Sequence, residues 1–318
     1  MGPRRWVQYG DPVTVVEGRS ALTLAALASV AVPGLDPVGV GGHAVDGLDY
    51  DLAVVSDTRK RRWVVRAPRR KTAAAALDVE SRLLPLLAGR LPFAVPEPAG
   101  YGPLPDGGRC MVYPELPGAA LHPGELVPGA GMAPALGKAL AAVHDLPHEV
   151  FDEAGVPTYT AEQYRQRLLS DVDRAASTGH VPTSLLTRWE AALEQVSHWR
   201  FPTTPVHGDL AAEHVLMADG AVTGMIDWGE ARVADPADDL AWVAVGADSD
   251  ALDSVLESYA MARNDQPDRH LLDRAQLAGE LSFARWLLTG VAADDSAIID
   301  QATEALRELA ERSAPAGE

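Results

Sequence analysis

The sequence HGDLAAEHVL at residues 207–216, followed by IDWGEA at residues 226–231, is the most informative part of this chain. Asp209 is followed five positions later by His214, and Asp227 comes thirteen positions after that. A carboxylate can take a proton from an alcohol, and an imidazole with a second carboxylate can hold a divalent metal ion against phosphates. Because phosphoryl transfer needs mainly such positioning and charge stabilisation, this spacing predicts a phosphoryl-transfer site.

Short apolar runs lie on both sides of this stretch. TPV at residues 204–206 predicts an extended segment that enters the loop, and MI at residues 225–226 predicts a buried strand that ends at Asp227. A carboxylate at the end of a buried strand is well placed to bind a metal ion. The nearby residues that we interpret as structural, because they hold the loop or lie at helix ends, are His144, His207, Asp235 and Asp239.

Each of the three chemical residues also has an ordinary structural interpretation. Taken alone, Asp209 could be a loop aspartate that accepts backbone N–H groups, and Asp227 could cap a turn. His214 could be a structural histidine, because magnesium prefers oxygen and imidazole is a softer donor. The spacing of the three residues together favours the catalytic interpretation over these alternatives.

This combination resembles the catalytic loop and the metal-binding aspartate of the aminoglycoside phosphotransferase-like kinases, which share a fold core with protein kinases. Most members carry asparagine where this chain has His214. A histidine there, followed by VL at residues 215–216 and by the run at residues 226–231, is similar to the macrolide 2′-phosphotransferases within that family. The resemblance implies that Asp209 is catalytic and that His214 and Asp227 bind Mg²⁺.

The composition is that of a globular enzyme. The chain has 318 residues, enough for one large domain or two lobes, with 47% hydrophobic and 23% charged residues. The net charge of −18 excludes a basic nucleic-acid footprint. The same acidity is explained either by solubility alone or by a site that attracts cationic small molecules. Cys110, the only cysteine, lies in an apolar run, so we expect a buried and inert thiol.

We also expect a soluble cytoplasmic protein that binds no membrane. The N-terminus lacks the apolar core of a signal peptide, and the apolar run at residues 21–32 is too short to span a bilayer. The sequence does not indicate an oligomeric state.

The predicted fold is α+β, with the two lobes of a protein kinase. We expect an N-terminal helical extension at residues 1–35, a small β-rich lobe at residues 36–113 and a hinge at residues 114–118. A larger helical lobe at residues 119–318 would carry the catalytic loop and the substrate site. The hinge sequence PELPG ends the preceding strand, because proline removes backbone donors and glycine frees the chain.

Periodicity locates the elements within these lobes. The small lobe is predicted to have strands at residues 48–55, 62–66 and 109–113 and a helix at residues 72–87. The helices predicted for the larger lobe cover residues 134–146, 162–176, 184–199, 250–263, 271–291 and 297–312.

The nucleotide is expected to bind the small lobe and the hinge. Arg66 ends a predicted strand at the place where kinases usually have a lysine that contacts phosphates, and Glu80 is its expected ion-pair partner. The alternative is a surface-facing pair of little energetic value. Glycines 39, 41 and 42 are expected to form a loop over the nucleotide, because Gly41 and Gly42 would let backbone amides approach a phosphate. The other expected nucleotide contacts are Tyr113, Glu115 and Leu116.

The resemblance implies transfer of the γ-phosphate of a nucleoside triphosphate, GTP in preference to ATP, to the 2′-hydroxyl of a macrolide amino sugar. That sugar carries a dimethylammonium group, which agrees with an acidic protein. One alternative is another small-molecule kinase of the same fold, acting on an aminoglycoside, an amino alcohol or a metabolite. The other is a non-catalytic module that binds nucleotide or drug. The candidate residues for the substrate wall are Glu230, Glu280 and Trp286.

Overall fold

The computed structural model describes residues 18–313 apart from residues 47, 48, 106, 128 and 130. Residues 1–17 of the predicted N-terminal extension therefore lie outside the described residues, as does the predicted start of a strand at Leu48. No helix among the described residues is long and apolar enough to cross a membrane.

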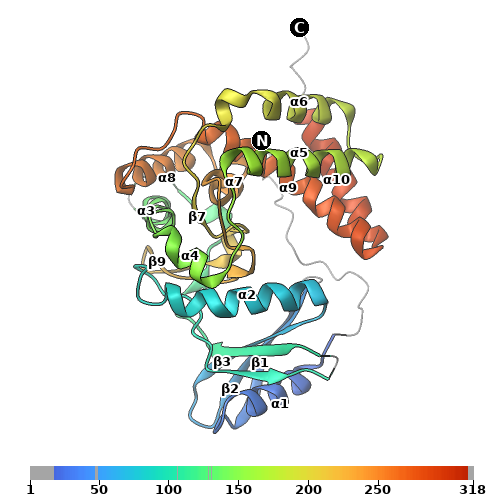
Figure 1. The fold of residues 1–318 in the computed structure, drawn as a ribbon. Helices are drawn as coiled ribbons and strands as arrows, with labels where there is room; N and C mark the ends of the chain where they lie inside the picture. The colour runs from blue at the N-terminus through green and yellow to red at the C-terminus, as the bar shows by residue number, and fades with distance from the viewer. Residues whose placement is uncertain (1–17, 47–48, 106, 128, 130, 314–318) are drawn as a thin grey trace. The chain divides into compact units, whose positions relative to one another are not determined.

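The chain divides into two compact units. The first comprises Met1–Ala88 with Val95–Leu116, and the second comprises Gly89–Ala94 with Pro117–Glu318. The first unit is built around an antiparallel sheet and the second is mainly helical, which confirms the predicted α+β class (Figure 1).

The first unit contains a five-stranded sheet in the order β1-β2-β3-β5-β4. Its elements are α1 (Ala21–Ala31), β1 (Pro37–Asp46), β2 (Tyr50–Asp57), β3 (Arg62–Pro68), α2 (Lys71–Leu87), β4 (Gly100–Pro103) and β5 (Arg109–Pro114). The apolar run that precedes the sheet becomes helix α1, and Leu24 and Ala28 on this helix pack with Val65 and Cys110 of the sheet in one core cluster. The thiol of Cys110 is fully buried, as predicted.

The hairpin between β2 and β3 is closed by Asp57. Its Oδ1 accepts the backbone N–H groups of Arg59 and Arg61, both at 2.9 Å, and its Oδ2 accepts Nε1–H of Trp63 at 3.1 Å. Burial acts to raise the pKa of Asp57, but these hydrogen bonds outweigh burial and hold the pKa at about 2. One ionised carboxylate therefore holds the turn between β2 and β3.

The prediction of a loop at the glycine run was wrong. Gly39, Gly41 and Gly42 lie within strand β1, which pairs with β2 along its length. The register shifts between Pro37 and Gly39 and again between Gly41 and His43, so the glycines lie at irregularities of an otherwise extended strand. Glycine is tolerated there because a bulge needs backbone freedom more than it needs a side chain.

The second unit has two small sheets among its helices. Strands β6, β8 and β9 form one sheet, and β7 pairs with β10 in the other. Its elements are β6 (Ala119–Ala120), α3 (Met132–His144), α4 (His148–Ala154), α5 (Ala161–Ser177), α6 (Thr183–Glu194), β7 (Thr204–Val206), β8 (Val215–Ala218), β9 (Ala221–Met225), β10 (Arg232–Ala234), α7 (Ala237–Gly246), α8 (Ser249–Ala262), α9 (Leu271–Ala293) and α10 (Ser296–Arg312).

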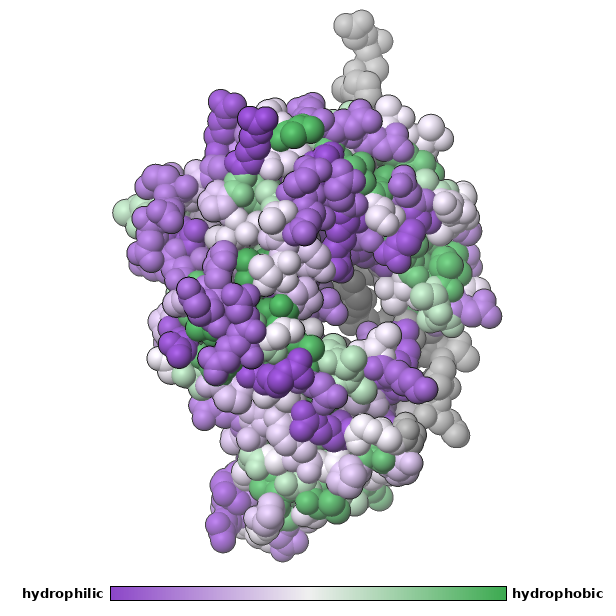
Figure 2. All heavy atoms as spheres, in the orientation of Figure 1, coloured by the Kyte–Doolittle hydropathy of each residue, from purple (hydrophilic) through white to green (hydrophobic). Residues whose placement is uncertain are grey.

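Helices α5, α6, α9 and α10 pack together in this unit (Figure 1). Their shared core contains the fully buried Trp189 together with Leu281 and Leu306. Polar residues predominate on the face of the molecule in Figure 2, as expected for an acidic chain. The helix predicted at residues 184–199 is interrupted. Helix α6 ends at Glu194, and a 3₁₀ turn, η2 (Val196–Trp199), follows because Nε1–H of Trp199 donates back to the Ala192 carbonyl.

Candidate active site

The loop that carries Asp209, the predicted catalytic residue, is held in place by one buried carboxylate. Asp239, on α7, accepts the backbone N–H of His207 through Oδ2 and that of Gly208 through Oδ1, both at 2.8 Å. Nε2 of His144 lies 3.1 Å from the same Oδ2, and Nδ1 of His144 lies 2.8 Å from the hydroxyl of Tyr259. Burial acts to raise the pKa of Asp239, but the hydrogen bond from His144 and the bonded amides lower it. Asp239 is therefore an ionised loop anchor.

A second anchor binds backbone carbonyls of the same region, whereas Asp239 binds backbone N–H groups. The guanidinium of Arg232, on β10, donates to the carbonyl of Gly208 at 2.9 Å and to the carbonyl of Glu230 at 2.9 Å. Arg232 is in turn bound by the carboxylate of Asp238 at 2.7 Å, which also accepts the hydroxyl of Tyr164. All of these side chains except that of Glu230 are buried. One arginine thus joins the loop before Asp209 to the turn after Asp227.

His207 has a structural role, as predicted. Its Nε2–H donates to the carbonyl of Ile226 at 2.9 Å, and its ring centroid lies 4.7 Å from that of Trp228. Complete burial lowers the pKa of His207, so the imidazole is neutral. Together with the hydrogen bond from Ile226 N–H to the His214 carbonyl at 3.0 Å, this contact ties the two halves of the site together.

The two predicted metal ligands face one another. Nδ1–H of His214 donates to the backbone carbonyl of Asp209 at 2.8 Å, which leaves the Nε2 lone pair directed away from the loop. This Nε2 lies 3.8 Å from Oδ2 of Asp227. Burial acts to lower the pKa of His214, whereas the carboxylates of Asp227 and Asp209 raise it, and the raising effect prevails.

This pair of donors fits a divalent cation. Their ligand atoms lie 3.8 Å apart, and a shift of about 0.9 Å would bring them to the separation of about 2.9 Å that adjacent ligands have around an octahedral Mg²⁺ ion. The backbone of Asp227 is left-handed at φ +67°, a conformation that aspartate tolerates better than most residues do. The loop geometry therefore directs the Asp227 carboxylate at some conformational cost, as is common at functional sites.

Asp209 itself is exposed. Among the residues that the structure describes, its carboxylate accepts no hydrogen bond, so the alternative of a loop aspartate that satisfies backbone amides does not hold. The backbone amides of this loop are satisfied by Asp239 instead. The carboxylate that the sequence singles out is thus available to an incoming hydroxyl group.

In the first unit, Arg66 and Glu80 form a buried ion pair. Nη1 of Arg66 lies 2.7 Å from Oε2 of Glu80, and the two side chains are 4% and 0% exposed. The guanidinium also lies over the ring of Tyr50, with its central carbon 3.8 Å from the ring centroid. The alternative of a surface-facing pair is therefore wrong, because both charges are removed from water.

The predicted hinge residues differ in what they leave available. Tyr113 is buried in β5, where it pairs with Val64. The backbone N–H of Glu115 donates to the carbonyl of Arg62 at 3.0 Å, and the Glu115 carboxylate binds the same arginine. Within the described residues, the N–H of Leu116 makes no hydrogen bond. Pro114 and Pro117 have no backbone N–H, and that of Glu115 is already bonded. Leu116 therefore supplies the available backbone N–H of this segment.

The three substrate candidates lie in different surroundings. Glu230 follows the predicted metal ligand Asp227 by three positions, and its side chain is 60% exposed. Glu280, on α9, accepts Nε1–H of Trp189 at 2.7 Å and also binds Arg188, so it ties α9 to α6. Trp286 is partly buried against the core of these helices. Of these three side chains, that of Glu230 interacts electrostatically with Asp209 and Asp227.

Sequence reasoning missed Arg232, Tyr164 and Asp238. Asp238 belongs to the run DPADDL at residues 235–240, in which a structural role was predicted only for the first and last aspartates. Asp235 binds Arg274 through both oxygens, at 2.7 and 3.1 Å, and accepts the N–H of Ala237. The sequence did indicate Arg232, because it lies among three apolar neighbours and is therefore expected to be buried. A buried arginine needs partners such as Asp238.

The chain is similar in sequence and fold to known phosphotransferases. A family model described as the phosphotransferase enzyme family matches residues 45–279. Viomycin phosphotransferase of Streptomyces vinaceus is 28% identical over 251 residues, which cover 72% of this chain and 82% of that protein.

Two solved structures resemble almost the whole chain. The apoenzyme of macrolide 2′-phosphotransferase MphH from Brachybacterium faecium is 27% identical with a TM-score of 0.76, over 93% of this chain and 99% of that one. A macrolide 2′-phosphotransferase of type I is 31% identical with a TM-score of 0.75, over 92% and 99% of the two chains. The matched segment contains Asp209, His214 and Asp227, and the chain therefore belongs to the phosphotransferase enzyme family.

Proposed function

We propose that this phosphotransferase moves the γ-phosphoryl group of GTP to the 2′-hydroxyl of the amino sugar of a macrolide antibiotic, which inactivates the drug. The observation that carries the proposal is the pairing of His214 with Asp227 beside the available carboxylate of Asp209. Similarity to two macrolide phosphotransferases along nearly their full length supports the choice of acceptor.

In the proposed reaction, Asp209 orients the 2′-hydroxyl and takes its proton as the oxygen attacks the γ-phosphorus, and the bond from this phosphorus to the β–γ bridging oxygen breaks to release GDP. His214, through Nε2, and Asp227, through Oδ2, would hold Mg²⁺, and the bound ion would neutralise phosphate charge. Asp239 and Arg232 keep the backbone before Asp209 in place. Such positioning is the main contribution that a protein makes to phosphoryl transfer.

The remaining contacts divide between nucleotide and drug. Arg66, held by Glu80, would contact phosphates in the first unit. The exposed carboxylate of Glu230 would attract the dimethylammonium group of the sugar. Because the co-substrate is an intracellular nucleotide, we place the reaction in the cytoplasm.

The hinge bears on the choice of base. Guanine and adenine present opposite donor and acceptor patterns, and a mismatched base leaves a buried polar group unpaired at a cost of about 1–3 kcal/mol. In the hinge, the N–H of Glu115 is already used and that of Leu116 is available, so few donors can pair with the base. We expect GTP to be preferred by roughly tenfold or more at equal low concentration.

Turnover assays test base and acceptor together. GTP and ATP would each be offered with an erythromycin-like macrolide, an aminoglycoside and viomycin, with loss of the γ-phosphate and the site of phosphorylation measured by mass spectrometry. The Asp209→Asn variant serves as the control for background hydrolysis. Faster transfer to an aminoglycoside or to viomycin than to the macrolide would contradict the proposed substrate, and a preference for ATP would contradict the proposed co-substrate.

A further inference from the structure

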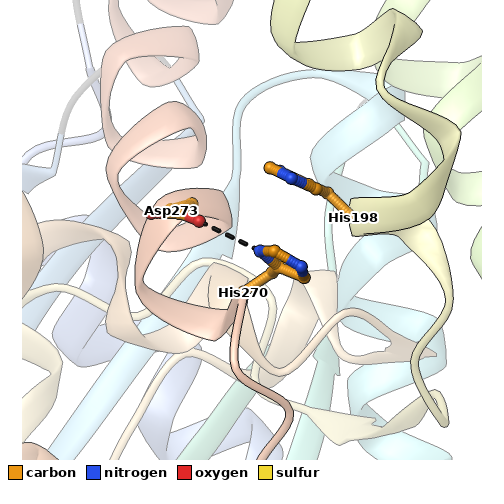
Figure 3. A group of neighbouring side chains, drawn as sticks. All are labelled: His198, His270 and Asp273. Atoms are coloured by element: carbon orange, nitrogen blue, oxygen red, sulfur yellow. Dashed lines mark hydrogen bonds and ion pairs between the residues drawn. The ribbon is translucent and has the colours of Figure 1, made fainter.

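Three potential metal ligands meet away from the catalytic loop, on the second unit. They are His198 in the 3₁₀ turn η2, His270 at the N-cap of α9, and Asp273 in the first turn of that helix. One ligand atom from each lies within 4.8 Å of the other two. In Figure 3 the two imidazoles lie one above the other, and the Asp273 carboxylate faces the lower ring. We propose that these three side chains bind a transition-metal ion of the zinc type.

The donor set has the chemistry of such a site. Two imidazoles and one carboxylate are ligands that zinc accepts, and a fourth position can be filled by water. Nδ1 of His270 lies 3.2 Å from Oδ2 of Asp273. Zinc ligands at bond lengths of about 2.0–2.1 Å lie about 3.3 Å apart at tetrahedral angles. These two atoms are therefore already spaced to share one ion.

The third ligand must turn before the ion can bind. The rings of His198 and His270 are stacked, with centroids 3.7 Å apart and an interplanar angle of 17°, whereas a metal ion lies in the plane of each ring that binds it. Within the described residues, the His198 imidazole makes no hydrogen bond, so its rotation breaks none. At His270 the ring proton moves from Nδ1 to Nε2, which releases an exposed hydrogen bond from Arg269.

The buried cation beside this cluster, Arg274, is neutralised by paired carboxylates. Both oxygens of Asp268 are bound by Arg274, and Arg274 also donates to the His198 carbonyl at 3.0 Å. The Asp273 carboxylate is 61% exposed and shares only the hydrogen bond with His270 among the described residues, so its charge is available. A bound ion would join η2 to α9 beside the link that Arg274 makes, so it should stabilise this unit.

The test uses the full chain, freed of metal by a chelator, in millimolar Mg²⁺, and compares variants so that any zinc bound beside Asp227 contributes equally to each. Zinc stoichiometry would be measured by competition with a chromophoric chelator, and stability by the thermal midpoint. The variants are His198→Ala and Asp273→Asn, which replace half-buried or exposed side chains. The matched control is His148→Ala, an exposed histidine at the start of α4.

We expect wild type and His148→Ala to bind one equivalent more zinc than the two site variants, and zinc to raise the midpoint of wild type and control alone by several degrees. Equal stoichiometry in wild type and His198→Ala would overturn the proposal. So would zinc retention by Asp273→Asn, or an equal loss in His148→Ala, which would indicate scattered binding to surface histidines. None of these outcomes depends on phosphoryl transfer.

Discussion

Arg232 occupies the space that a side chain on Gly208 would need. Its Nη1 lies 2.6 Å from the position of a Cβ built on Gly208, while Nη2 donates to the Gly208 carbonyl at 2.9 Å. The same Cβ position is 2.2 Å from the carbonyl oxygen of Glu230, and Gly208 has φ +87°. The residue before Asp209 is therefore glycine for two reasons, its left-handed backbone and the arginine packed against it.

We expect Gly208→Ala to lower stability by about 3 kcal/mol and to reduce kcat more than tenfold, because Arg232 and the turn at Glu230 must move. Urea unfolding and steady-state turnover would measure both effects. Gly179→Ala is the matched control, since Gly179 has φ +74° but nothing within 4 Å of its Cβ position. Equal losses in the two variants would attribute the effect to backbone strain alone.

Asp239→Asn should destabilise the chain by about 3 kcal/mol at neutral pH, because an amide NH₂ would face one of the donors that the carboxylate now accepts. The folded-state pKa of Asp239 is lowered, so its stabilisation is present above the unfolded pKa near 3.9 and is lost as pH falls below that value. The difference in unfolding free energy between wild type and variant should shrink when measured from pH 6 down to about pH 3. A difference independent of pH would mean that Asp239 is not ionised.

Asp209→Asn should reduce the single-turnover rate by about 10² to 10⁴ while nucleotide affinity stays near that of wild type, because the general base is lost and no binding contact is removed. Glu213→Gln, an exposed carboxylate in the same loop, provides the control and should retain its rate. A rate for Asp209→Asn within threefold of wild type would remove this residue from the mechanism.

Asp227→Ala should weaken nucleotide affinity in the presence of Mg²⁺ as well as turnover, because a ligand that joins metal and phosphates acts on both. Calorimetry with and without Mg²⁺ would separate metal-dependent from metal-independent binding. Asp227→Asn, which tolerates the left-handed backbone, controls for strain. Unchanged affinity for the magnesium nucleotide in Asp227→Ala would exclude a role as metal ligand.

His214→Asn should keep part of its activity with Mg²⁺, since the amide oxygen can replace Nε2 as a ligand, whereas His214→Leu offers no donor and should lose far more. Initial rates at several Mg²⁺ concentrations would show whether added metal rescues the asparagine variant. If the two variants turn over equally, the hydrogen bond from His214 to Asp209 is a structural contact and no more.

Much of the fold follows from periodicity. The helices α5, α8, α9 and α10 lie within one or two residues of their predicted bounds, because each presents an apolar face at helical spacing. The glycine run in β1 and the end of α6 were predicted wrongly. Both depend on partners distant in sequence or on a folded-back side chain, namely strand β2 and Trp199.

The order of residues was enough to identify Asp209, His214 and Asp227, because they lie within nineteen positions of one another and their chemistry is carried by residue type. Only the tertiary structure revealed how that stretch is held. Asp239 binds Gly208 across 31 positions, and Tyr164 reaches Asp238 across 74. A hydrogen bond between distant segments leaves no local spacing in the sequence, so burial and partner geometry decided these roles.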